Sequence, residues 1–166
     1  MTNLVIRRAM PEDAKKFINL LVQLKKESDA FTIDPSLGTM PLKEQEREIM
    51  LVNQTRSFLI GLAELDGEVV GMIQVQEIND SGIGEIGIAV LNKYSHKGIG
   101  TQLMDFMIDW ATYDSNLSTL SLVVKKTNQH AINLYQHSGF EITKKRVLNA
   151  RGGFNSTFEF KYTIKK

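Results

Sequence analysis

The segment from Val90 to Thr101, VLNKYSHKGIGT, combines residue types that could bind an anion. A strand-like run ends at Val90, a polar loop follows, and Gly98 and Gly100 flank the expected start of a helix. The first N–H groups of a helix have no partner within it, and the helix dipole adds positive potential, so a phosphate is stabilised there. Glycine lets the backbone approach such a ligand closely. The segment therefore indicates a phosphate-binding loop.

Two common phosphate loops do not fit this segment. Counting from Gly98, the sixth position of a GxGxxG dinucleotide-binding pattern is Leu103, and the lysine of a Walker motif is absent. A structural alternative is that the two glycines only relieve a steric clash with a neighbouring strand. Other parts of the sequence are needed to choose between a phosphate-binding loop and glycines that only relieve a steric clash.

A second pattern lies further along the chain, in the segment NQHAINLYQHSGF from Asn128 to Phe140. An amphipathic helix that stops at Gly139 accounts for the spacing of its apolar residues. That interpretation does not explain why Asn128 and Tyr135 occur together.

Together, the two patterns resemble motifs A and B of the GNAT superfamily of N-acetyltransferases. The segment SHKGIG at 95–100 is similar to the Q/R-x-x-G-x-G/A loop of motif A, with Ser95 in place of the usual Gln or Arg. The segment at 128–140 matches the N-x-x-A-x-x-L-Y-x-x-x-G-F pattern of motif B in full. The resemblance implies acetyl-CoA as co-substrate and no metal.

The resemblance also implies roles for individual residues. In the family, backbone N–H groups of the motif A loop hold the CoA pyrophosphate, and the preceding strand binds the acetyl oxygen and pantetheine. Tyr135 matches the family tyrosine that protonates the departing CoA thiolate. The implied cofactor-binding residues are Ala89, Val90, Ser95, His96, Lys97, Gly98, Ile99, Gly100, Thr101, Asn128 and Tyr135.

Acetylation needs a neutral amine, and because an aliphatic amine has a pKa of about 10.4, a group must accept its proton. Glu85 resembles in position the glutamate that some family members use as this base. Its direction depends on whether its strand carries the bulge usual in the family. An exposed turn glutamate, with a water relay as base, is the alternative. His96, His130 and His137 fit solvated surface positions better than bases, and their spacing does not indicate a metal site.

The acceptor amine is expected to bind near the end of the first helix. Glu27, Asp29 and Phe31 offer carboxylates and an aromatic ring suited to an ammonium group. This segment resembles the E-S/T-x-F stretch of some small-amine and amino-acid acetyltransferases, with Phe31 one residue later. The structural alternative is a helix-terminal loop whose Phe31 packs into the core. Tyr94 is a further candidate for the acceptor pocket.

Hydrophobic periodicity indicates which elements position these residues. The pair Asp66-Gly67 predicts a tight hairpin turn, and Thr127 or Asn128 can cap a helix. With the resemblance, the pattern predicts a single α/β domain over 1–166, with a mixed, mostly antiparallel sheet, two splayed strands and about four helices. The expected strands are 4–8, 57–65, 68–77, 86–90, 120–124, 140–147 and 154–164, and the expected helices begin near 13, 41, 98 and 128.

Composition narrows the function classes. The chain has 166 residues, 42% of them hydrophobic, and a formal net charge of +1, so no broad basic field attracts nucleic acid or an anionic membrane. The absence of cysteine excludes disulfides, thiolate metal sites and a cysteine nucleophile. No secretory signal or membrane-spanning run is recognisable, so a cytoplasmic protein is expected. The family resemblance also makes a homodimer possible.

The sequence therefore predicts an enzyme that acetylates a small primary amine, such as a polyamine, amino sugar or amino acid. A protein N-terminus or lysine is the alternative acceptor, and the sequence does not choose between them. A CoA-binding regulatory module without catalysis is a different class, against which Tyr135 argues. A noncatalytic interaction domain would need neither the glycine loop nor Asn128.

Overall fold

The computed structural model describes residues 3–27, 38–150 and 153–166, and its strands form one mixed sheet. The strands lie in the order β1-β2-β3-β4-β5-β7-β6, and every neighbouring pair is antiparallel except β4 and β5. This confirms the predicted mostly antiparallel sheet. The seven strands are β1 (Leu4–Arg8), β2 (Phe58–Leu65), β3 (Glu68–Glu77), β4 (Ile83–Val90), β5 (Thr119–Lys125), β6 (Glu141–Ala150) and β7 (Gly153–Thr163).

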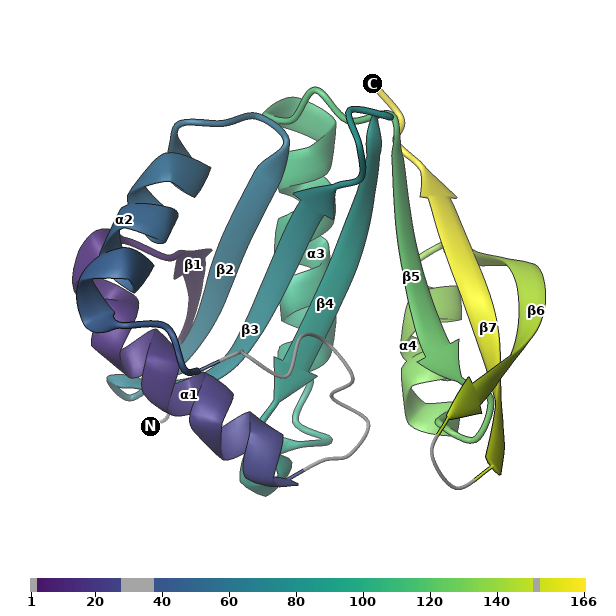
Figure 1. The fold of residues 1–166 in the computed structure, drawn as a ribbon, viewed down its shortest axis with the longest axis horizontal. Helices are drawn as coiled ribbons and strands as arrows, with labels where there is room; N and C mark the ends of the chain where they lie inside the picture. The colour runs from purple at the N-terminus through teal and green to yellow at the C-terminus, as the bar shows by residue number, and fades with distance from the viewer. Residues whose placement is uncertain (1–2, 28–37, 151–152) are drawn as a thin grey trace.

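Helices cover both faces of this sheet (Figure 1). On the β1–β4 half, α1 and α2 lie on one face and α3 on the other, while α4 packs against the part formed by β5, β7 and β6. None of the described helices has the length and apolar character needed to cross a bilayer. The described residues form four α-helices, as predicted, and two short 3-10 helices: α1 (Ala14–Glu27), α2 (Leu42–Asn53), α3 (Ile99–Tyr113), α4 (Gln129–His137), η1 (Pro11–Asp13) and η2 (Asn92–Tyr94).

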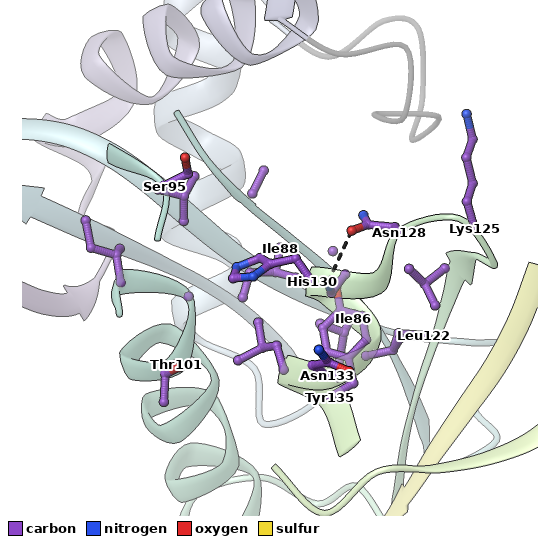
Figure 2. Close-up of a pocket in the computed structure, with 18 of the residues that line it drawn as sticks. Ile86, Ile88, Ser95, Thr101, Leu122, Lys125, Asn128, His130, Asn133 and Tyr135 are labelled. Carbon is purple, nitrogen blue, oxygen red and sulfur yellow. Dashed lines mark hydrogen bonds between the residues drawn. The ribbon is translucent and has the colours of Figure 1, made fainter. Parts of the chain in front are cut away.

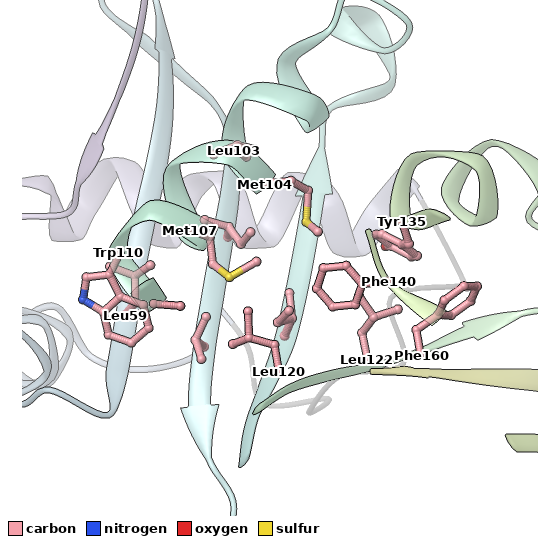
Figure 3. Close-up of a cluster of buried hydrophobic side chains, with 14 of the residues drawn as sticks. Leu59, Leu103, Met104, Met107, Trp110, Leu120, Leu122, Tyr135, Phe140 and Phe160 are labelled. Atoms are coloured by element: carbon pink, nitrogen blue, oxygen red, sulfur yellow. The ribbon is translucent and has the colours of Figure 1, made fainter. Parts of the chain in front are cut away.

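Two hydrophobic cores fix these layers. Leu103, Met107 and Trp110 recur every three or four residues along α3, so they share one face and pack against the sheet (Figure 3). On the opposite face, Phe17 and Leu21 of α1 are buried against the sheet. The sheet that carries the site is therefore held from both sides.

The hairpin between β2 and β3 forms where the sequence predicts it. Asp66 and Gly67 have φ angles of 50° and 86°, so both central residues of the turn are left-handed. Such a turn matches the twist of the two strands that it joins. The prediction of a tight turn at this pair is confirmed.

The strand before the glycine loop differs from expectation in two ways. β4 begins at Ile83, three residues before the predicted start, so Glu85 lies inside a strand and not in a turn. Gly84 has no side chain to show the alternating pattern of a strand, so the sequence does not indicate that the strand begins this early. Glycine is needed at this position because a Cβ there would lie 2.6 Å from the Val75 side chain. The β3–β4 ladder also pairs residues one for one from Gly71 to Glu77, so it lacks the expected bulge.

β4 and β5 separate soon after they begin. Their parallel pairing covers only Ile83 with Thr119, Gly84 with Leu120, and Glu85 with Ser121. Beyond these pairs the two strands diverge, which opens a gap between the two halves of the sheet (Figure 1). The predicted splayed strands are confirmed.

The turn after β1 is anchored by an ion pair. The Asp13 carboxylate accepts hydrogen bonds from both terminal nitrogens of Arg7, at 2.6 and 2.8 Å, and from the Met10 N–H at 2.8 Å. The Arg7 hydrogen bond above all holds the pKa of Asp13 below its usual range. The resulting stability is present above the unfolded-state pKa of about 3.9 and is lost as the pH falls through the lowered pKa of the folded state.

We expect Asp13→Asn to lower the free energy of unfolding at pH 7 by about 2 kcal/mol. This is less than the ~3–5 kcal/mol for a fully buried pair, because the Arg7 side chain is 30% exposed. Urea denaturation should show the difference from wild type shrinking as the pH is lowered below about 3.9, the pKa of the unfolded state. Glu64→Gln, which removes the negative charge from the longer 3.3 Å contact to Arg7, is the control and should cost less than about 1 kcal/mol. A difference that stays constant with pH would contradict the assignment.

Candidate active site

A cavity of about 1180 Å³ occupies the gap between β4 and β5. Its walls come from both strands, the end of α1, the loop before α3, and α4. Lys97 is not among the described lining residues, while Asp29 and Phe31 lie outside the part of the chain that the structure describes. The predicted site residues that line the cavity are Glu27, Glu85, Ala89, Val90, Tyr94, Ser95, His96, Gly98, Ile99, Gly100, Thr101, Asn128 and Tyr135.

The start of α3 presents unpaired N–H groups to this cavity. Gly98 is its N-cap residue and no side chain caps the helix. The N–H groups of Ile99, Gly100 and Thr101 donate no hydrogen bond to any described residue, whereas the next one, from Gln102, donates to the Gly98 carbonyl at 3.1 Å. Together with the helix dipole, these free donors make this end of the cavity suited to an anion.

The two glycines of the loop are needed for different reasons. Gly98 has a φ of 80°, and a Cβ there would meet no atom within 4 Å, so its backbone conformation is what requires glycine. At Gly100, a Cβ would lie 3.3 Å from Leu134 Cδ2, so glycine lets α3 approach α4. Relief of a steric clash thus explains Gly100 in part, although the neighbour is a helix and not a strand.

The start of α4 differs from that of α3, because it has its own cap. Asn128 Oδ1 accepts a hydrogen bond of 3.2 Å from the Ala131 N–H, as predicted for the N-cap (Figure 2). At the other end, Gly139 has a φ of 97° and the Phe140 N–H donates to the Tyr135 carbonyl at 3.0 Å. Both ends of the helix that carries Tyr135 are therefore fixed.

Tyr135 lies between the cavity and the main core. Its residue is 8% exposed, and its ring meets the Phe160 ring edge to face at a centroid distance of 5.8 Å (Figure 3). Burial raises the pKa of Tyr135 to about 12. Its phenol is therefore protonated throughout the neutral range, with a proton to donate and little tendency to ionise.

The edge of β4 that faces the gap offers backbone groups as well. The Leu91 N–H donates to the Val70 carbonyl of β3 at 2.9 Å. Because backbone groups alternate along a strand, the N–H groups of Ile88 and Val90 then point into the gap, and that of Ala89 points toward β3. Of the two backbone positions predicted to bind the acetyl group and pantetheine, Ala89 and Val90, only Val90 has an N–H group that points into the gap. The N–H group of Ile88, which was not predicted, points into the gap as well.

The side of the cavity next to α1 is polar. Glu85 is exposed and lies directly opposite Gln76 on β3, so both side chains share the face covered by α1. Glu27 Oε1 accepts a hydrogen bond of 2.8 Å from the Asn92 N–H, which ties the end of α1 to the turn after β4. This wall brings two carboxylates to the cavity.

Tyr94 and Ser95 connect the loop to its surroundings. The Tyr94 hydroxyl donates to Glu68 Oε2 at 3.4 Å, and the Lys97 ammonium lies 5.8 Å from the centre of the Tyr94 ring. The Ser95 hydroxyl donates to the Asn92 carbonyl at 2.8 Å. The Ser95 hydroxyl hydrogen is thus used within the loop and is not free to donate to an anion.

Several cavity residues were not predicted from the sequence. His130, considered only as a surface residue, meets the predicted His96 edge to face with ring centroids 4.4 Å apart and links the loop to α4. His137 also lines the cavity, and no three acidic or histidine side chains of the described residues group as metal ligands. Asn133 of α4 also lines the cavity, as do Gln74, Gln76, Lys125 and Thr157, for which only knowledge of the strand register could have given a signal.

Comparison with known proteins places this geometry in a family. The model of the acetyltransferase (GNAT) family matches residues 23–140. The chain is 33% identical over 82 residues to a spermidine N(1)-acetyltransferase of Escherichia coli (strain K12), a match that covers 49% of this chain and 44% of that protein. It is 35% identical over 94 residues to an N-alpha-acetyltransferase of Sulfurisphaera tokodaii, covering 50% and 56%. The chain thus spans about half the length of the curated relatives it matches.

A solved structure agrees over the whole fold. A GNAT-family acetyltransferase from Streptococcus pneumoniae superposes with a TM-score of 0.91 and 27% sequence identity, covering 98% of this chain and 100% of that one. The family model matches more than half of the chain, and it includes the glycine loop and all of α4. The chain therefore belongs to the GNAT family of acetyltransferases.

Proposed function

We propose that this protein is an acetyl-CoA-dependent N-acetyltransferase that acts on a primary amine of a small molecule, such as a polyamine, amino sugar or amino acid. The observation that carries the proposal is the uncapped start of α3, whose free N–H groups open into the gap between β4 and β5. Residues 1–166 are proposed to form one catalytic domain. Its cytoplasmic location, a homodimer and the absence of nucleic-acid or membrane partners stay predictions.

The residues present fit CoA in two respects. The free N–H groups of Ile99, Gly100 and Thr101 suit a pyrophosphate, and the loop needs no side chain from Ser95 to hold it. The cavity volume of about 1180 Å³ is somewhat above the range of roughly 300–1,000 Å³ that is typical of ligand pockets. A long ligand that extends from the α3 amides along β4 has room in this gap.

When bound, acetyl-CoA supplies an acetyl group that is activated as a thioester. The backbone N–H groups of Ile88 and Val90, which face the gap, orient and polarise the acetyl carbonyl. Glu85, on the α1 side, accepts the proton of the acceptor amine directly or through water. The amine nitrogen forms a C–N bond to the acetyl carbon and the C–S bond breaks, while Tyr135, on the α4 side, donates its hydroxyl hydrogen to the departing sulfur. The two proton-handling groups thus belong to opposite walls of the cavity.

The acceptor assignment is supported by the polar wall next to α1. Glu27 and Glu85 bring negative charge to the α1 side of the cavity, whereas the start of α3 is suited to phosphate. An ammonium group that binds near either carboxylate is stabilised by its charge. The fold neighbours and family membership support the transfer chemistry, and the charge supports an amine as the acceptor.

Calorimetric titration of acetyl-CoA into the purified protein tests the first half of the proposal. We expect one site per chain with micromolar or tighter binding. A colorimetric assay of CoA release with spermidine, glucosamine and the L-amino acids then tests transfer. Absence of acetyl-CoA binding would reject the proposal, and binding without transfer to any amine would indicate the regulatory CoA-binding module instead.

A further inference from the structure

The β5 wall of the cavity carries a cation. Lys125 is the last residue of β5 and lines the cavity. Ser121 pairs with Glu85 in the parallel ladder, so their side chains lie on one face of the sheet, and alternation along β5 places Lys125 on that face too. Figure 2 agrees, because the Lys125 side chain extends away from Leu122 and Tyr135. Lys125 therefore lies on the acceptor side of the cavity.

The Lys125 ammonium group has no hydrogen-bond or ion-pair partner among the residues that the structure describes. Thr157, its direct neighbour on β7, is 5% exposed and also lines the cavity. The Thr157 hydroxyl likewise has no partner among the described residues. Buried polar groups are normally paired, so the unpaired Thr157 hydroxyl, beside a partly exposed lysine in a cavity wall, points to a ligand.

The charge on the two walls has opposite sign. Glu27 and Glu85 line the α1 side, with Gln74 and Gln76 beside them, while Lys125 lines the β5 side. A purely cationic substrate, such as a polyamine, would be attracted to the first wall and repelled by the second. A ligand that carries both a cation and an anion complements both walls.

We propose that the acceptor carries a carboxylate beside its amine, as an amino acid does, and that Lys125 binds this carboxylate while the amine faces Glu85. The inference rests on the proposed function, and it narrows the acceptor from any small amine to a zwitterionic one. An ammonium–carboxylate hydrogen bond is charge-assisted and stronger than a neutral one. Lys125 is then the residue that selects the substrate, and it takes no part in proton transfer.

The test compares each L-amino acid with its C-terminal amide, which keeps the amine and removes the negative charge. For wild type, we expect kcat/KM to be at least tenfold higher for the amino acid, with the difference mainly in KM. Lys125→Met should remove this preference, and Lys125→Arg should retain much of it. Lys126→Met is the matched control, because Lys126 is the next residue, is exposed and does not line the cavity.

Calorimetry with acetyl-CoA accompanies each variant. Its affinity should be unchanged in Lys125→Met; a loss of affinity with an unchanged substrate preference would assign Lys125 to the cofactor and overturn the inference. Acetyl transfer to amides or spermidine as efficient as to amino acids would overturn the inference alone. Acetyl-CoA binding without transfer to any amine would overturn the proposed function together with it.

Discussion

Replacing Tyr135 by phenylalanine is expected to lower kcat by roughly 10²–10⁴-fold, the range for losing a general acid. The change removes only the hydroxyl, and the phenyl ring of the variant keeps the edge-to-face contact with Phe160. Acetyl-CoA affinity, measured by calorimetry, should stay within about twofold. Such a loss in kcat alone identifies an interaction made in the transition state.

The raised pKa gives this prediction a second readout. Because burial raises the pKa of Tyr135 to about 12, the acid form persists as the pH rises and is lost only near that value. We therefore expect no alkaline fall in kcat from Tyr135 between pH 7 and about 10. Tyr113→Phe is the control, since Tyr113 is 79% exposed at the end of α3. Unchanged turnover in Tyr135→Phe would contradict the assignment.

Replacing Gly100 by glutamate is expected to weaken acetyl-CoA binding by at least 100-fold. A Cβ at this position already lies 3.3 Å from Leu134 Cδ2, so a longer side chain must turn toward the cavity. There its carboxylate blocks the free N–H groups of the first turn and repels a phosphate. The measurement is calorimetric titration of acetyl-CoA into the variant.

Two further variants separate this effect from misfolding. Gln102→Glu adds the same charge to the same turn of α3 at an exposed position that does not line the cavity, so its binding should stay close to that of wild type. Gly100→Ala should bind within about tenfold, because the end of the Leu134 side chain can move by a few tenths of an ångström. Thermal denaturation of all three variants shows whether they fold. Tight binding by a folded Gly100→Glu would place the pyrophosphate elsewhere.

The features that were predictable from sequence depend on local chemistry. Asp66-Gly67, the Asn128 cap and the left-handed Gly139 each follow from residues within a few positions of one another. The free N–H groups at the start of α3 are local as well, because a helix start exposes them whatever it packs against. For this reason the loop and α4 could be located without a structure.

The features that were missed depend on pairing between distant segments. Gln76 enters the site because β3 pairs with β4 without a bulge, and Lys125 enters it because β5 leaves β4 after Ser121. The alternation of apolar and polar residues shows which side chains share a face of a strand. It does not show which strands are neighbours in the sheet, or at which residue two neighbouring strands separate. The resemblance to the family was enough to select Glu85 as a candidate base. Its position inside β4 became clear only from the pairing of β3 with β4.

The order of the strands has a consequence for how the protein is made. β7 lies between β5 and β6, so β5 gains its second neighbour only from residues 153–163. β1 to β4 are joined in order along the chain and can assemble while the ribosome is still translating the remainder. The β4 wall of the cavity can thus form early, whereas the β5 wall is complete only after β7 has been synthesised. The enzyme should gain its ability to bind acetyl-CoA abruptly, once residues 153–163 have left the ribosome.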